Sequence, residues 1–258
     1  MEIKMKTGLI LEGGAMRGLF SAGIMDVMME NGITCDGVIG VSAGAVFGSN
    51  YISGQIGRSI RYNLKYCRDK RYGGLYSLLT TGDIYNKNFC YNEIPLKYDP
   101  FDFAAFESNP TKFYVVCTDV ETGKPVYHQY MGRKDHGFDW IQASASMPLV
   151  SRIVTIDGQK LLDGGVADSI PIRKFEQMGY DRNVIILTQP KNYRKSENSL
   201  MPLIRHKYRA YPEFIKTNEN RHLVYNDTLD YIFEKEKEGS VFVFRPDEAL
   251  PVSRVEKN

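Results

Sequence analysis

The first 52 residues alternate between short apolar runs and segments with helical spacing, and this order restricts the fold more than any other feature. Residues 7–11 and 38–41 are apolar runs typical of buried strands. Residues 18–31 and 43–52 carry apolar side chains at helical spacing, and Gly32 is placed to end the first helix. Strands that alternate with helices predict a parallel sheet covered by helices, so we assign the chain to the α/β class.

The remaining sequence extends this sheet without a visible break. No repeat, low-complexity segment or linker interrupts the chain, so residues 1–258 are expected to form a single domain with a mostly parallel central sheet flanked by helices. No apolar run approaches the roughly 18 residues that a membrane-spanning helix needs. Further strands are predicted at 112–120, 125–130, 153–156, 160–162, 184–187 and 241–244, and a long exposed helix at 218–238.

A first glycine motif, Gly13-Gly14-Ala15-Met16-Arg17-Gly18, connects the first strand to the first helix. Backbone N–H groups in such a turn lie beside the positive end of a helix and can bind a phosphate or an oxyanion. A tight turn without a ligand is the alternative. The dinucleotide fingerprint fails because Ala15 replaces its second glycine and no acid ends the second strand, and no Gly-Lys-Ser/Thr follows as a Walker loop requires.

A second motif, Gly40-Val41-Ser42-Ala43-Gly44, stands between the second strand and the second helix. This is the G-x-S-x-G pattern in the strand-turn-helix context that exposes a nucleophilic serine. The helix start behind Ser42 would stabilise developing negative charge. Ser42 could instead be a structural N-cap in a turn of small residues.

A third motif, Asp163-Gly164-Gly165, follows the hairpin predicted around Asp157 and Gly158, and in isolation it is an ordinary turn. A nucleophilic serine needs a base. In the order of the α/β-hydrolases, His206 or His222 would follow Asp163 as that base, but only one strand precedes the serine and no HGGG loop is present. None of the four histidines, His128, His136, His206 and His222, lies in a glycine-rich loop.

Together, the ordered set LEGGAMRG, GVSAG and DGG resembles the bacterial-type patatin-like phospholipases, and the stretches CTDVETGKPVYH from Cys117 and ASASMPLV from Ala143 add to the resemblance. It implies a patatin-like three-layer architecture and a Ser-Asp dyad without histidine. Carried onto this sequence, the dyad is Ser42 and Asp163. The oxyanion loop is Gly13, Gly14 and Ala15, and the supporting motif residues are Arg17, Gly18, Gly40, Gly44, Gly164 and Gly165.

Two departures from the family pattern bear on these expectations. The family loop has glycine where Ala15 stands; its N–H can still donate, although its Cβ would crowd the substrate. Similar chains continue with another helix after a segment like 250–257, so a chain shortened at the C-terminus is expected.

The implied function is a serine esterase or lipid acyl hydrolase of the phospholipase A or lysophospholipase kind, which works through an acyl-enzyme. It needs no cofactor, and no residue cluster has the spacing of metal ligands. The alternatives are an esterase with a Ser-His-Asp triad and a non-enzymatic protein that binds an anion or phosphate in the Gly-rich loop. Nucleic-acid binding is not expected, since no motif for it is present.

The placement of charged residues and cysteines bears on membrane contact and on the cellular compartment of the protein. Residues 57–76 carry six basic residues and one acidic, and residues 191–222 carry eight basic and three acidic, so each stretch is +5 and bears tyrosines. Contact with an anionic membrane surface is one interpretation, and a solvated helix face is the other. Four separated cysteines and an apolar N-terminal run too short for a signal peptide predict a cytoplasmic protein, peripheral to the membrane.

Overall fold

The two apolar runs at the start of the chain form neighbouring parallel strands, β1(Lys6–Leu11) and β2(Gly37–Val41), in the computed structural model, which describes residues 5–253. All of β2 and the last four residues of β1 are buried. Strands covered on both faces read as continuous apolar runs, which is why the sequence locates them well. Leu11 pairs with Gly40, so both strands end at one edge of the sheet.

The sheet contains eight strands within the described residues, in the order β5-β6-β3-β2-β1-β7-β8, with β4 also paired to β3. Neighbours from β3 to β8 along this order are parallel, whereas β4, β5 and β6 are antiparallel additions. The predicted mostly parallel α/β sheet is therefore confirmed. The other strands are β3(Lys112–Asp119), β4(Pro125–Gln129), β5(Val154–Ile156), β6(Gln159–Asp163), β7(Tyr180–Ile186) and β8(Val241–Phe244).

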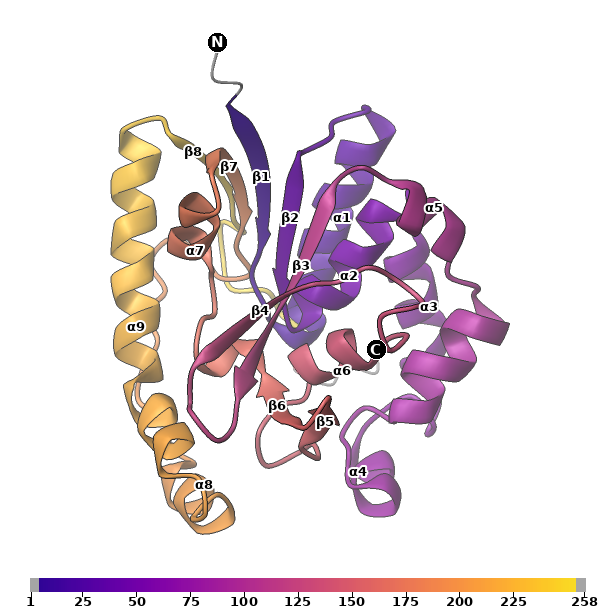
Figure 1. Ribbon diagram of the computed structural model, residues 1–258, viewed down its shortest axis with the longest axis vertical. Helices are drawn as coiled ribbons and strands as arrows, with labels where there is room; N and C mark the ends of the chain where they lie inside the picture. Colours follow the sequence, from indigo (N-terminus) through magenta and orange to yellow (C-terminus); the bar gives the residue numbers. More distant parts are fainter. Residues whose placement is uncertain (1–4, 254–258) are drawn as a thin grey trace.

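Helices cover both faces of the sheet, which gives three layers (Figure 1). Successive residues of β1 belong to different cores: Leu9 and Leu11 pack on the side of α1 and α2, and Ile10 on the side of α7 and α9. The helices are α1(Gly18–Glu30), α2(Ala43–Ile52), α3(Arg58–Tyr66), α4(Leu75–Thr81), α5(Phe103–Ser108), α6(Asp139–Ser144), α7(Ile172–Gln177), α8(Met201–Lys207), α9(Pro212–Lys237), the short η1(Ala15–Arg17) and η3(Gly164–Val166), and the π-helical η2(Phe89–Tyr98).

The last long helix differs from its prediction. It begins at Pro212 rather than at residue 218, since proline suits a first helical turn. It is also not exposed throughout, because Phe214, Tyr225, Leu229 and Ile232 on one face are buried against the sheet and η3. The many charged residues of its outer face hide this stripe in the sequence.

Candidate active site

The three glycine motifs meet at the carboxyl ends of the parallel strands. The first follows β1 and the second follows β2, and these strands are neighbours. Val41 pairs with Val116 on β3, and the next residue, Cys117, pairs with Asp163 at the end of β6. This register brings the third motif beside Ser42. The chain leaves β1 for β2 on one side while β7 lies on the other, and such switch points are where open α/β sheets bind ligands.

Ser42 occupies a strained backbone position at the start of α2, with φ 55° and ψ −122°. Its N–H donates to Ser144 Oγ at 2.8 Å, and the Ser144 hydroxyl donates to the Val116 carbonyl at 2.6 Å. The Ser42 side chain makes no helix-capping bond, which argues against the structural N-cap alternative. Gly44 is required by close packing, because a Cβ there would lie 2.4 Å from the Leu11 carbonyl oxygen.

The Ser42 hydroxyl points at Asp163. Ser42 Oγ donates to Asp163 Oδ2 at 2.7 Å, and both residues are buried, at 8% and 6% exposed. The other carboxylate oxygen accepts the Gly165 N–H at 2.8 Å. The backbone of Asp163 is held on both sides, because its N–H donates to the Ser146 carbonyl and its carbonyl accepts the Thr118 hydroxyl. An acceptor oxygen at this distance can take the serine proton directly.

The Gly-rich loop passes close to Ser42. A Cβ on Gly13 would lie 2.9 Å from the Ser42 Cβ, so only glycine allows this approach. Within the described residues, no hydrogen bond is made by the N–H of Gly13, Gly14 or Ala15, which leaves all three as donors. Ala15 has φ 49°, the left-handed region that favours glycine. This backbone conformation explains why the family usually has glycine at this position.

A buried carboxylate that lies outside the three predicted motifs supports this loop. Glu12 is 3% exposed and accepts from the Thr188 N–H at 2.6 Å, the Thr188 hydroxyl at 3.1 Å and the Tyr225 hydroxyl at 2.6 Å. Thr188 also donates to the Gly13 carbonyl. Burial, followed by the charge of Glu12, raises the pKa of Tyr225, so its hydroxyl keeps its proton. The sequence feature that could have indicated this role is an acidic residue, Glu12, directly after an apolar strand.

Ser144 and Thr118, which lie outside the three glycine motifs, also support the site. Both are fully buried, and they hold the backbones of Ser42 and Asp163 respectively. They lie in the stretches from Ala143 and Cys117 that carried part of the family resemblance. For each of them, the sequence feature that could have indicated a supporting role is a hydroxyl residue inside an otherwise apolar buried segment.

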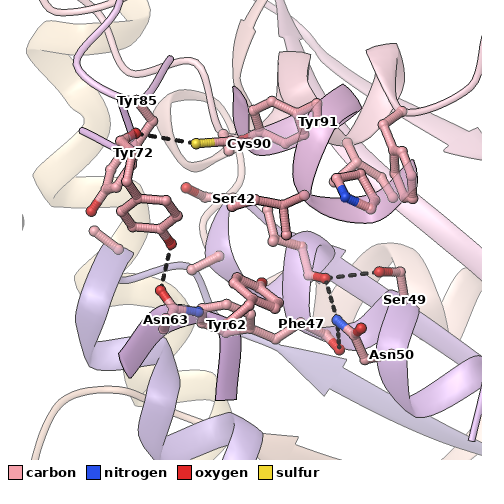
Figure 2. A pocket seen from close by; sticks show the side chains of 18 of the residues that line it. Ser42, Phe47, Ser49, Asn50, Tyr62, Asn63, Tyr72, Tyr85, Cys90 and Tyr91 are labelled. Atoms are coloured by element: carbon pink, nitrogen blue, oxygen red, sulfur yellow. Dashed lines mark hydrogen bonds between the residues drawn. The ribbon is translucent and has the colours of Figure 1, made fainter. Parts of the chain in front are cut away.

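Two cavities meet at Ser42, and Ala15, Ser42 and Met147 line both of them. The first has a volume of about 90 Å³ and extends along α2 between aromatic rings; Figure 2 shows Ser42 among Tyr72, Tyr85 and Tyr62. The second has a volume of about 400 Å³ and is polar. Its lining includes Glu12, Arg17, Asp163, Ser169, Lys195, Asn198, Arg221 and His222.

The other predicted motif residues lie around this junction. Arg17 faces the polar cavity, and its Nε is buried without a hydrogen-bond partner in the described part of the chain. Gly18 lets α1 approach α2, since a Cβ there would lie 2.8 Å from the Phe47 ring. Gly40 and Gly164 are equally crowded by backbone oxygens, and the N–H of Gly165 binds Asp163.

The four histidines lie in different surroundings. His128 contacts Asp135 and stacks on Trp140, and His136 contacts Asp157. His206 is exposed on α8. His222 lines the polar cavity with Ser42 and Asp163, and its Nε2 lies 4.0 Å from Glu197. The Ser42 hydroxyl bonds Asp163 and not an imidazole.

The basic stretches differ from each other. Residues of the 191–222 stretch line the polar cavity, whereas the tyrosines of the 57–76 stretch are largely internal. Tyr62, Tyr66 and Tyr72 are at most 8% exposed, so these three rings are not available for contact with a membrane surface. The Tyr66 ring packs against Phe89 and Tyr98, and the Tyr72 ring packs against Tyr85.

The part of the chain that the structure describes, residues 5–253, contains no group of three or more His, Cys, Asp or Glu side chains arranged to hold a metal ion. Likewise, none of its helices combines the length and apolar character needed to cross a membrane.

Fold and site together define a three-layer α/β protein in which a buried serine-carboxylate pair faces an apolar and a polar cavity. The family comparison narrows this class: the model of the patatin-like phospholipases matches residues 9–175, and the chain belongs to that family. Residues 211–258 match a second model, a domain of unknown function, DUF6363. That segment contains β8, which pairs with β7 in the same sheet.

Curated relatives are similar at modest identity. The "Uncharacterized protein YjjU" of Escherichia coli is 27% identical over 191 residues, which cover 72% of this chain and 52% of YjjU. "Lysophospholipase nte1" of Aspergillus terreus is 27% identical over 190 residues, which cover 67% of this chain and 11% of that protein. The structure of VipD from Legionella pneumophila aligns with 96% of this chain and 63% of its own, at 12% identity and a TM-score of 0.45.

Proposed function

We propose that the protein is a serine acyl hydrolase that cleaves carboxylic esters of lipids through a Ser42-Asp163 dyad. The observation that carries the proposal is the 2.7 Å hydrogen bond from Ser42 Oγ to Asp163 Oδ2 at the floor of two joined cavities. Family membership and the relatives named lysophospholipase support a lipid substrate. The single fold unit 1–258 is part of the same proposal, because the described strands share one sheet.

In the first half of the reaction, Ser42 Oγ attacks the ester carbonyl carbon and its proton passes to Asp163 Oδ2. The carbonyl electron pair moves onto oxygen, where N–H groups of Gly13, Gly14 and Ala15 stabilise the charge. The intermediate collapses, the bond to the leaving alcohol breaks, and that alcohol takes the proton from Asp163.

In the second half, water attacks the acyl-enzyme and gives its proton to Asp163. Collapse releases the carboxylic acid, and the proton returns to Ser42 Oγ. Asp163 can serve in both directions because its second oxygen is held by Gly165 N–H, which keeps the carboxylate aimed at Ser42 throughout.

The two cavities suit the two parts of an ester. The walls of the cavity of about 90 Å³ are mostly rings and aliphatic side chains, which suits an acyl chain. The polar cavity of about 400 Å³ suits the alcohol side, a headgroup with hydrogen-bonding or charged atoms. A lysophospholipid has both an acyl chain and a polar headgroup. In this assignment the acyl chain lies in the apolar cavity and the headgroup in the polar cavity, on opposite sides of the ester bond that Ser42 attacks.

A triad with His222 is the second candidate, and one observation favours it: His222 lines the same cavity as Ser42 and Asp163. Its Nδ1 is buried and has no hydrogen-bond partner among the described residues. The direct bond between Ser42 and Asp163 favours the dyad instead. A binding protein that uses only the Gly-rich loop does not account for that bond.

Contact with an anionic membrane belongs to the same proposal. Helices α4 and α8 both lie at the end of the molecule opposite the start of β1, on either side of the sheet (Figure 1). Segment 147–150, which lines the polar cavity, connects the two helices: the Val150 carbonyl accepts the Ile84 N–H beyond α4, and the Leu149 N–H donates to the Tyr208 hydroxyl after α8. Large apolar side chains exposed on these helices and directly before α8 are Leu75, Tyr76, Leu79, Leu200 and Leu203.

Basic residues accompany this apolar surface. The last turn of α8 carries Arg205, His206 and Lys207, and the exposed Arg209 follows. Lysine and arginine near an anionic membrane each contribute about 1 kcal/mol to binding, and the attraction is screened by salt. We place the protein in the cytoplasm, because its four cysteines form no disulfide within residues 5–253, as a reducing compartment favours.

Labelling with a fluorophosphonate probe tests the proposed nucleophile. The probe phosphonylates an activated serine and remains attached through a covalent bond. We expect one label per chain at Ser42, found by peptide mass analysis, and no label in Ser42→Ala. Labelling at another serine, or none in folded protein, would contradict the proposal.

A further inference from the structure

The apolar cavity beside Ser42 follows helix α2 and has a measurable length. Ser42, Val46 and Asn50 line it at intervals of one turn, and the eight residues from Ser42 to Asn50 rise about 12 Å. Its volume of about 90 Å³ has room for roughly six to nine water-sized groups. A methylene is about as large as a water molecule, so the length and the volume of the cavity both indicate room for a short acyl chain.

The far end of this cavity is closed by a buried polar cluster. Arg58 is 4% exposed; it donates to Asn50 Oδ1 at 2.6 Å, and its Nε lies 3.3 Å from an Asp99 carboxylate oxygen. The Tyr62 ring lies 5.3 Å from the guanidinium carbon of Arg58. All of these residues except Asp99 line the cavity.

The neighbouring wall is also fixed by hydrogen bonds. The Tyr72 hydroxyl donates to Asn63 Oδ1 at 2.5 Å, and the Cys90 thiol donates to the Tyr72 carbonyl at 3.2 Å (Figure 2). Burial raises the pKa of Tyr62, Tyr72 and Cys90, so these wall groups are uncharged. The wall accepts an apolar chain, but it cannot move aside without leaving buried polar atoms unpaired.

We propose that this cavity is the acyl site and that Tyr62, with Arg58 and Asn50 behind it, limits the acyl chain to about six to ten carbons. The inference rests on the proposed hydrolase function and narrows its substrate class to medium-chain acyl esters. Up to the limit, each added methylene gains contact with the rings. Beyond it, further carbons meet the closed polar end or must stay in water.

The native protein should show this limit as a break in a chain-length series. We would measure kcat/KM for p-nitrophenyl esters of four to sixteen carbons in one detergent at fixed concentration. Burial of each methylene should raise kcat/KM by about fourfold up to eight carbons. The sixteen-carbon ester should then be at least about tenfold poorer than the eight-carbon ester. Equal kcat/KM values for these two esters would overturn the proposal.

Two substitutions should move the break in opposite directions. Val46→Phe adds bulk one helical turn from Ser42 and should lower kcat/KM at eight carbons by about tenfold or more, while a two-carbon ester changes less than about threefold. Tyr62→Ala should raise the ratio of twelve-carbon to eight-carbon kcat/KM by about tenfold. Leu64→Ala, which shortens an exposed side chain on the same helix as Tyr62, is the matched control and should leave the series unchanged. Since Val46 is only half-buried, Val46→Phe keeps the test decisive if Tyr62→Ala does not fold.

A binding measurement separates this proposal from the proposed function. If the folded protein hydrolyses none of the esters, the hydrolase proposal fails, and the length limit is judged by calorimetry with saturated fatty acids of eight and sixteen carbons. Binding of the shorter acid that Val46→Phe abolishes, with at least tenfold weaker binding of the longer one, supports the limit. Equal binding of both acids, or binding that Val46→Phe leaves unchanged, overturns it.

Discussion

The hydroxyl of Ser42 donates to the carboxylate of Asp163 at 2.7 Å, although 121 residues separate them in the chain. The register of β3 explains this proximity, because Val116 pairs with Val41 and Cys117 pairs with Asp163. Ser42 follows β2 and Asp163 ends β6, and both of these strands pair with β3. Each backbone is held by a buried hydroxyl residue, Ser144 for Ser42 and Thr118 for Asp163. A pair held in this way is arranged before any substrate binds.

Removal of the nucleophile should abolish turnover without unfolding the protein. Ser42→Ala should lower kcat for p-nitrophenyl butyrate by about a thousandfold or more, as expected when a group that forms the covalent intermediate is lost. Circular dichroism should show native helix content. Ser53→Ala, which removes a buried hydroxyl at the far end of α2, is the control and should retain activity. Full activity in folded Ser42→Ala would refute the assignment.

The base is tested at Asp163 and His222. Asp163→Asn should be nearly as damaging as Ser42→Ala, because the two residues act as a unit. His222→Ala should retain most of the activity, and so should the chain with all four histidines replaced. A folded His222→Ala protein that loses activity by a hundredfold would establish a triad and end the dyad proposal.

Bulk in the Gly-rich loop should affect kcat more than KM. Ala15→Val adds a β-branched side chain at φ 49° and would turn the N–H groups away from the oxyanion, a contact made chiefly in the transition state. Gly14→Val should act likewise, because a Cβ there would lie 2.7 Å from the Thr188 hydroxyl. Ala15→Gly is the control and should remain active. A change in KM alone would indicate ground-state binding instead.

The buried carboxylate behind the loop should matter for stability. Tyr225→Phe removes one of three donors to Glu12 and should lower the free energy of unfolding by about 1–3 kcal/mol. Tyr231→Phe also removes a hydroxyl bonded to a glutamate, Glu176, but at a more exposed site, and should cost less than about 1 kcal/mol. Urea denaturation measures both. Equal losses would mean that burial of Glu12 is not the cause.

Membrane contact is tested by co-sedimentation with neutral and anionic vesicles at two salt concentrations. We expect salt-sensitive binding to the anionic vesicles, reduced several-fold by Leu79→Asp on α4 and by Leu203→Asp on α8. Val27→Asp alters an apolar side chain on α1 that is as exposed as Leu203, and it serves as control. Equal binding to both vesicle types, or none, would refute the membrane contact and leave the esterase proposal intact. Binding that extends to DNA of any sequence would indicate a general polyanion patch.

The strands were predictable from the sequence where they are buried on both faces. Segments 7–11 and 38–41 correspond to β1 and β2 within one or two residues, because a continuous apolar run is what such strands require. The long helix was misplaced at its start and misjudged as exposed, since its charged outer face dominates the pattern. Segment 57–108, which forms α3, α4, η2 and α5, lies outside the elements predicted from the sequence, although α3 is amphipathic.

The sequence by itself determined the α/β class and the candidate nucleophile, because G-x-S-x-G between a strand and a helix is a local pattern. The family resemblance pointed to Asp163, but only the tertiary structure decided that this acid meets Ser42, since their contact depends on the register of strands far apart in the chain. It also showed that Glu12 lies under the Gly-rich loop and that Arg58 and Tyr62 close a pocket. Local patterns follow from backbone geometry within a few residues, whereas a cavity forms only when distant segments pack together.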